Sequence, residues 1–165
     1  MKNPKKILIH HTASPQEWTT YIDVNRWHKD RGYSVSAKGF YIAYHYFIGK
    51  DGKVTQARSD WERTMHTRVE DVNNESIAIC LAGNFEQEEL SEAQRDALSD
   101  LLLEKTQEYG VKPKNVLRHR DVQATLCPGK NLNIELYRNK IKRRDEKINA
   151  LCKLIRKLVN IFKNL

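Results

Sequence analysis

Residues 119–129 read HRDVQATLCPG, and residues 7–12 read ILIHHT. In the first stretch a histidine precedes a cysteine by eight positions, and a Pro-Gly turn follows the cysteine. This is not a zinc-finger spacing, because no CxxC pair brackets a short structural loop. Zinc favours imidazole nitrogen and thiolate sulfur, and a catalytic zinc keeps three protein ligands with the fourth position left to water. The two stretches therefore predict an open zinc site with His10, His119 and Cys127 as ligands.

The rest of the chain alternates between short apolar runs and amphipathic stretches. The apolar or alternating runs predict strands at residues 6–11, 41–49, 54–57, 75–83 and 116–118. The amphipathic stretches predict helices at residues 19–31, 90–109 and from 133 to the C-terminal end. Ser91 with Gln94 forms a capping box for the second helix, and Gly110 ends it. The polar residues 33–40 and 59–74 are expected to be loops beside a groove.

This order of elements indicates the fold class. Strands interleaved with helices predict an α/β fold with a mixed central sheet flanked by helices. A basic amphipathic C-terminal helix follows. We expect residues 1–142 to form the domain and residues 143–165 to form a helical extension.

Four further polar or reactive side chains are expected to be structural. His10 and His11 face opposite sides of a strand, so His11 is expected to pack or to form hydrogen bonds. Cys80 lies in a near-continuous apolar run and is expected to be an inert core thiol. His28 is expected at the surface or at a rim, and Asp121 is expected to orient His119 or an arginine.

The net charge of +8 is concentrated near the C-terminal end. From Arg138 onward, ten Lys or Arg stand against Asp145 and Glu146, so the preceding residues balance. A basic character confined to a tail does not indicate a nucleic-acid-binding domain, and no specific nucleic acid is expected. No apolar run approaches the ~20 residues that span a bilayer. Three cysteines are a small and odd number, which argues against a disulfide framework. The chain is expected to be a monomer.

Four motifs together resemble the type 2 amidase family, which includes phage amidase endolysins and animal peptidoglycan recognition proteins. They are IHHTAS, AYHYFIGKDG, ESIAICLAGNF and HRDVQATLCPG, and the resemblance covers residues 5–142. It implies a zinc-dependent N-acetylmuramoyl-L-alanine amidase whose substrate is peptidoglycan. Residues 1–6 resemble the start of a signal peptide, but the apolar run that follows is too short. We therefore expect synthesis in the cytoplasm without a signal peptide, with action on the cell wall after release or transfer across the membrane.

The resemblance assigns roles to three more residues. Tyr44 matches the family's active-site tyrosine, with a packing tyrosine as the alternative. Thr125 falls where some family members have lysine and others threonine, and it is expected to be catalytic, although a hydroxyl is a poor acid for the departing amine. His66 corresponds to a histidine at the substrate cleft and is expected to bind substrate, the alternative being a solvated loop histidine.

Two imidazoles and one thiolate would leave a zinc ion with net charge +1, enough to polarise an amide carbonyl and activate water. The rival from another class is a peptidoglycan-binding module without catalysis. Cys127 discriminates between them, because binding-only relatives commonly lose this ligand. A structural zinc domain would need a fourth ligand among His11, His45 and His66.

The C-terminal stretch carries an apolar stripe of heptad spacing, with a basic opposite face. Its members are Ile141, Ile148, Ile155 and Phe162 with Leu151, Leu158 and Leu165, and Arg144 interrupts the series. Three interpretations remain open. The stripe packs on the chain's own domain, or it engages an anionic membrane or envelope surface, or it associates with a second copy as a coiled coil.

Overall fold

The computed structural model describes residues 3–163, and the side chains of residues 3–161. A five-stranded mixed sheet in the order β3-β2-β4-β1-β5 lies at the centre, as the sequence predicts. Its strands are β1 (Lys6–His11), β2 (Tyr46–Ile48), β3 (Val54–Gln56), β4 (Ser76–Leu81) and β5 (Val116–Arg118). The helices are α1 (Tyr21–Asp30), α2 (Glu70–Glu75), α3 (Glu92–Tyr109) and α4 (Ile134–Lys163), with 3-10 turns at Pro113–Asn115 and His119–Asp121.

The centre of the sheet is built from the two longest apolar runs. β1 and β4 pair in parallel over six residues, and nearly all of their side chains are buried. β5 and β2 extend the parallel pairing on the two sides, and only β3 is antiparallel. Because the parallel strands end at one edge, the side chains that follow β1 and β5 are brought together there.

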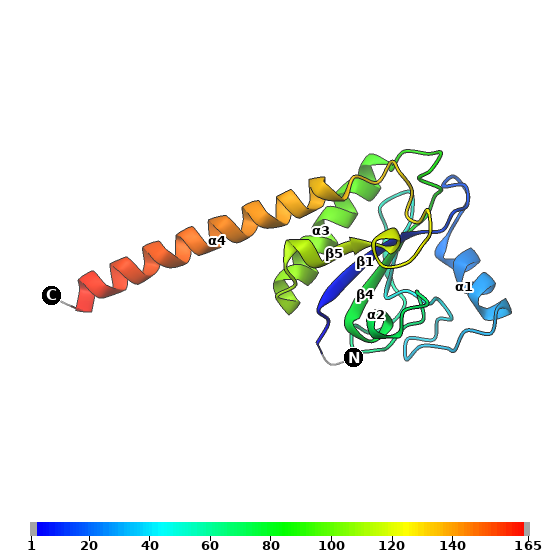
Figure 1. Ribbon diagram of the computed structural model, residues 1–165, viewed down its shortest axis with the longest axis horizontal. Coiled ribbons are helices and arrows are strands. Elements are labelled where there is room, and N and C mark those ends of the chain that lie inside the picture. Colours follow the sequence, from blue (N-terminus) through cyan, green and yellow to red (C-terminus); the bar gives the residue numbers. More distant parts are fainter. Residues whose placement is uncertain (1–2, 164–165) are drawn as a thin grey trace.

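Helices cover both faces of the sheet (Figure 1). α3 and the first turns of α4 pack on the larger core cluster, which includes Ile7, Ile9, Ile77 and Ile79. α1 packs on the smaller cluster of the opposite face through Val24. The predicted cap of α3 is confirmed: Ser91 Oγ accepts from Gln94 N–H at 3.0 Å, and Gly110 adopts φ +65°.

The strand predicted at residues 41–49 is much shorter in the structure. The His45 backbone N–H donates to Ala78 O at 2.9 Å, and the His45 ring Nδ1 accepts from Ala78 N–H at 2.9 Å. A side-chain nitrogen therefore takes the place of a backbone carbonyl just before β2. A regular strand over residues 41–49 would place Tyr44, Tyr46 and Ile48 on one face. In the structure Tyr44 packs on the α1 side, whereas the other two pack on the α3 side.

The loop expected at residues 59–74 is also partly wrong, since its end begins α2. A buried asparagine organises this segment: Asn73 accepts from the Thr67 N–H through Oδ1 and donates to the Thr67 carbonyl through Nδ2. These bonds form a compact turn that hydrophobic periodicity does not reveal.

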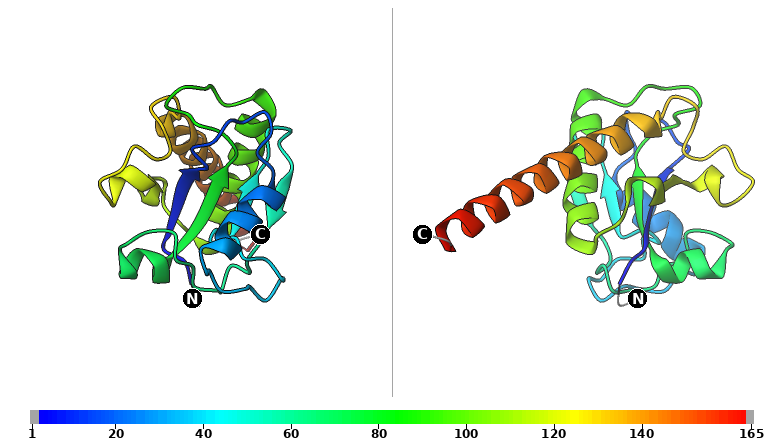
Figure 2. Two further views of the ribbon diagram at one scale, coloured as in Figure 1. Left: turned by 90° about the vertical axis from the view of Figure 1, so that its right-hand side faces the viewer. Right: turned by 60° about the vertical axis from the view of Figure 1, so that its left-hand side comes forward.

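α4 leaves the body of the molecule as a single long rod (Figure 1), and the other views agree (Figure 2). Ile141 is buried at 1% exposure, whereas every described side chain from 146 to 161 is exposed. The interpretation that the whole apolar stripe packs on the chain's own domain is therefore wrong, because the described part of the stripe beyond residue 145 is exposed. The side chain of Phe162 and all of Leu165 lie outside the described residues. No described helix is long and apolar enough to cross a membrane.

Candidate metal centre

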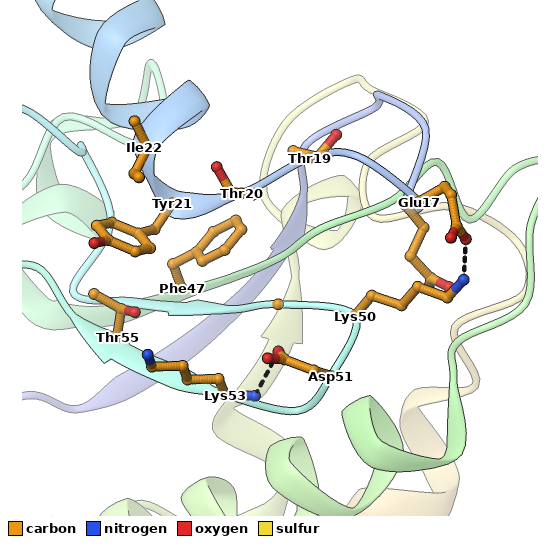
Figure 3. Close-up of a pocket in the computed structure, with 12 residues that line it drawn as sticks. Glu17, Thr19, Thr20, Tyr21, Ile22, Phe47, Lys50, Asp51, Lys53 and Thr55 are labelled. Carbon is orange, nitrogen blue, oxygen red and sulfur yellow. Dashed lines mark hydrogen bonds and ion pairs between the residues drawn. The ribbon is translucent and has the colours of Figure 1, made fainter.

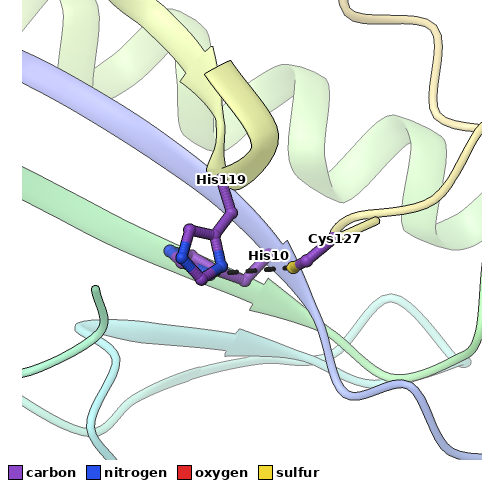
Figure 4. A group of neighbouring side chains, drawn as sticks. All are labelled: His10, His119 and Cys127. Carbon is purple, nitrogen blue, oxygen red and sulfur yellow. Dashed lines mark hydrogen bonds between the residues drawn. The ribbon is translucent and has the colours of Figure 1, made fainter. Parts of the chain in front are cut away.

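His10, His119 and Cys127 converge from three parts of the chain (Figure 4). His10 is the penultimate residue of β1, His119 directly follows β5, and Cys127 lies in the next loop. Their candidate ligand atoms all lie within 4.8 Å of one another. The sequence-predicted ligand set is thus brought together in the structure.

The loop that carries Cys127 is held in place by backbone contacts. Arg120 N–H donates to Cys127 O at 2.9 Å, and the Arg120 guanidinium binds Glu86 at 2.7 Å. Gly129 adopts φ +103°, and a Cβ there would stand 2.2 Å from the Phe85 carbonyl carbon. Only glycine fits this close approach, which seats the loop against the segment that follows β4.

A buried chain of hydrogen bonds supports His10 from beneath. His10 Nε2 lies 2.9 Å from His66 Nδ1, and His66 Nε2 lies 3.0 Å from Ser76 Oγ. Ser76 Oγ in turn donates to the Val72 carbonyl at 2.5 Å. Because the serine has one proton, it must accept from His66 Nε2–H, and the neutral His66 must then accept from His10 Nε2–H. The lone pair of His10 Nδ1 then faces Cys127 Sγ, its hydrogen-bond partner at 3.8 Å.

The site has the chemistry that a zinc ion requires. His119 Nε2 is buried and has no hydrogen-bond partner among the described residues. Burial lowers the pKa of His10 and of His119, so both imidazoles are neutral ligands. Burial also raises the pKa of Cys127 to about 12, and the His11 backbone N–H donates to its sulfur at 3.4 Å. A cation at this point would satisfy His119 and favour the thiolate, so the residues fit the metal.

Residues 1–130 match the N-acetylmuramoyl-L-alanine amidase family. The chain belongs to this family. Peptidoglycan-recognition protein SC2 of Drosophila melanogaster is 31% identical over 127 residues, which cover 76% of this chain and 68% of that protein. The endolysin of Enterobacteria phage T3 is 28% identical over 133 residues, covering 76% of this chain and 81% of the endolysin. The solved structure of N-acetylmuramoyl-L-alanine amidase LysC from Clostridium intestinale URNW has a TM-score of 0.74 at 30% identity, covering 86% of this chain and 87% of that one.

Within the amidase-family domain, Tyr44 lies beside His10, one of the three candidate ligands. Its ring centroid is 5.1 Å from that of His10, and the irregular backbone before β2 turns it to this side of the sheet. Burial raises its pKa well above the ordinary value of 10, so the phenol keeps its proton. Thr125 Oγ1 accepts from Cys127 N–H at 3.2 Å, which leaves the hydroxyl proton of Thr125 available.

Two histidines lie deeper than the sequence predicts. His28 is 7% exposed, and its Nδ1 accepts from Ala43 N–H at 3.0 Å, so the surface or rim position is wrong. α1 packs over this segment and buries the ring. His66 is also 7% exposed with both ring nitrogens engaged, which excludes the solvated-loop alternative. Its predicted contact with substrate stays a prediction, and the structure shows it as a support for His10.

The remaining candidates behave as structural residues. His11 Nδ1 accepts from Phe85 N–H at 3.1 Å, and both ring nitrogens of His45 bond to backbone groups, so neither joins the cluster. Cys80 is fully buried, and burial raises its pKa well above the ordinary value of 9. Asp121 binds Arg118 at 2.8 Å, which agrees with orientation of an arginine. Among the described residues the candidate cluster is His10, His119 and Cys127, which would leave the fourth position of a bound zinc open.

A separate cavity of about 590 Å³ lies between the start of α1 and the β2–β3 hairpin (Figure 3). Phe47 lies at its centre, and an ion pair between Glu17 and Lys50 stands at one end. Phe47 is in register with Cys80, which is in register with His10. The cavity therefore opens on the same face of the sheet as the metal centre, two strands away from it.

Proposed function

We propose that this chain hydrolyses the amide bond between N-acetylmuramic acid and L-alanine in peptidoglycan, using a zinc ion held by His10, His119 and Cys127. The convergence of the three ligand atoms within 4.8 Å carries this proposal. Membership of the amidase family and the endolysin relatives support it. When bound, zinc supplies a Lewis acid that polarises the scissile carbonyl and activates water.

The chain's own residues then stabilise the charge that develops. The carbonyl oxygen becomes an oxyanion as the amide is attacked, and the protonated Tyr44 phenol is a donor on the correct side of the sheet. Loss of one such donor costs about 3 kcal/mol of transition-state stabilisation. Thr125 can add a second hydrogen bond, but its hydroxyl is too weak an acid to protonate the departing amine. We therefore assign Thr125 to the oxyanion and not to the proton transfer.

The second candidate is a peptidoglycan-binding module without catalysis, because recognition proteins are among the relatives. The observation that favours hydrolysis is the position of Cys127, whose sulfur stands 3.8 Å from His10 Nδ1. A module that only binds has no need of a thiol aimed at an imidazole lone pair. We further propose that the enzyme is a monomer. It is made in the cytoplasm and acts on the cell wall after release or transfer across the membrane.

A digest of purified cell walls tests the reaction. We expect new alanine amino groups in the soluble products without new reducing sugar ends, measured by amine labelling and mass analysis. New reducing ends would identify a glycosidase instead. Binding to walls without any released amine would support the non-catalytic module.

Metal removal tests the ligand assignment separately. A chelator should abolish amide hydrolysis and added zinc should restore it. Zinc bound per chain should fall in His10→Ala, His119→Ala and Cys127→Ala. Cys152→Ala is the matched control, because Cys152 is exposed on α4. Full zinc binding by any of the three variants would remove that residue from the ligand set.

A further inference from the structure

The outer part of α4 is a helix without cover. The last side chain that ties it to the body is Arg144, whose guanidinium donates to the Leu103 carbonyl and to Thr106 Oγ1. From 146 to 161 every side chain is exposed. The large apolar residues in this span are 41–57% exposed: Ile148, Leu151, Leu154, Ile155, Leu158, Val159 and Ile161. We call residues 146–161 the projecting segment.

Two unlike faces run along the projecting segment. At 100° per residue its apolar side chains fill an arc of about 180°. Lys153, Arg156 and Lys157 lie in the other half, and residues 148–161 contain no Asp or Glu. A helix with a broad apolar face and a cationic opposite face is suited to the boundary between lipid headgroups and acyl chains. It lies along a bilayer without spanning it.

The same pattern argues against a second copy of the chain as the partner that buries the apolar face. A two-stranded coiled coil buries a narrow seam and uses charged flanking positions to choose its partner. With Ile148 and Leu151 in the seam, four of the five flanking positions are apolar, namely Cys152, Leu154, Val159 and Ile161, and only Lys147 is charged. The basic side chains have no acidic residue between 148 and 161 to meet in a copy of the segment. An anionic surface complements that charge.

We propose that the projecting segment binds the surface of a bilayer that contains anionic phospholipid, with its apolar half inserted and its basic half at the headgroups. The body is then held at the membrane by a rod that does not contact the metal centre. This inference does not depend on the proposed hydrolysis, because binding is measured without a wall substrate.

The test is co-flotation of the full chain with vesicles. Phosphatidylglycerol mixed with phosphatidylcholine should carry the protein upward, and pure phosphatidylcholine should carry much less. High salt should reduce the binding, because screening weakens the attraction of exposed charges. The fraction of protein that floats with the vesicles is measured by gel densitometry.

Two pairs of variants separate the two faces. Lys153→Glu with Lys157→Glu should lower the partition coefficient by more than roughly 25-fold, because each lysine lost removes about fivefold and each new carboxylate is repelled by the anionic surface. Its control is Lys112→Glu with Lys114→Glu, which makes the same charge change at exposed positions of the body. Leu151→Gln, Ile155→Gln and Leu158→Gln together should abolish flotation. Asn149→Gln, Ala150→Gln and Asn160→Gln are their control on the polar half.

The outcomes decide between the covers. Loss of flotation in both test sets with both controls unchanged supports the proposal. Equal binding of the charge control and the charge variant would overturn it, since net charge alone would then explain the binding. The protein could instead fail to float and form an oligomer in sedimentation, with the glutamine triple variant sedimenting as a monomer. This outcome would assign the segment to self-association. Circular dichroism should show that all variants keep the fold, because every substituted side chain is exposed.

Discussion

The central strands β1 and β4, which carry the metal centre, and the projecting segment are both rich in apolar residues, but the strands are buried and the segment is exposed. β1 and β4 bury nearly every side chain and hold His10 through the chain to His66 and Ser76. The projecting segment exposes every side chain. An apolar pattern therefore shows that a face needs cover, and only the tertiary structure shows whether the chain itself provides it.

The comparison can be made within one helix. Ile141 and Ile155 belong to the same stripe of α4, fourteen residues apart, but they are 1% and 50% exposed. The difference arises because α4 is bonded to α3 near Arg144, whereas every described side chain from 146 onward is exposed. The helix is continuous across the domain boundary expected at 142.

The largest effect is expected at Gly129, beneath the Cys127 loop. Gly129→Ala should lower the free energy of unfolding by about 4 kcal/mol, because the new Cβ would overlap the Phe85 backbone at a left-handed φ. Zinc binding should fall with it. Gly39→Ala is the control: its φ of +84° is similar, but its surroundings are open, so it should cost about 1 kcal/mol. Equal losses in urea unfolding would show that φ alone matters.

The next effect tests the two ends of the α4 stripe directly. Ile141→Ala should cost about 3 kcal/mol by leaving a cavity in the core. Ile155→Ala should change stability by less than about 0.5 kcal/mol, because this side chain is exposed. Urea unfolding of the two single variants provides the measurement. A large loss in Ile155→Ala would break the comparison, since it would reveal a partner for the outer helix.

Much of this structure was predictable from the sequence, for physical reasons that particular residues illustrate. Continuous apolar runs gave the central strands, and Ser91, Gln94 and Gly110 marked the ends of α3 correctly. The ligands were recognisable because zinc accepts few donor types and the motifs resemble a known family. Local chemistry of this kind does not require knowledge of distant contacts.

The sequence predictions that the structure contradicts concern residues whose position depends on contacts with distant parts of the chain. The break before β2 arises because the His45 ring pairs with Ala78, 33 residues away. The burial of His28 depends on how α1 packs, and the link from His66 to His10 spans 56 residues. Neither hydrophobic periodicity nor spacing records such contacts. The signal that remained for His66 was its family position alone.

Acid should weaken the body but not the projecting segment, which contains no histidine. Burial lowers the pKa of His45 from 6.5 to about 4, so between these values the unfolded chain binds more protons than the folded one. Stability is therefore full above pH ~6.5 and falls as the pH drops towards 4, by about 2 kcal/mol for this residue between pH 7 and 5. Urea unfolding with chelator present should show that His45→Gln loses part of this slope. An unchanged slope would mean that His45 is not protonated on unfolding.

A smaller effect should follow from cutting the support of His10. Ser76→Ala removes the acceptor of His66 Nε2–H and should cost about 1–2 kcal/mol of stability. Because Ser76 acts on His10 only through His66, zinc binding in a chelator competition should weaken about tenfold, the low end of the effect of losing a ligand's direct partner. Ser99→Ala is the control, because this buried serine accepts from Lys140 and lies away from the ligands. Equal zinc affinity in the two variants would show that the chain does not position His10.

The smallest effect on the body should come from removing the projecting segment itself. A stop after Asn149 retains Ile141 and the Arg144 contacts to α3, whereas a stop after Lys142 would remove the latter. The shorter chain should therefore keep its free energy of unfolding within about 0.5 kcal/mol, because the described side chains that it loses, at residues 150–161, are all exposed. Its zinc affinity should be unchanged, while its flotation with anionic vesicles should vanish. A stop after Asn139 is the contrasting cut, since it also deletes Ile141 and should destabilise the domain strongly. If the stop after Asn149 were equally damaging, the projecting segment would be part of the folded body and the contrast between the two regions would not hold.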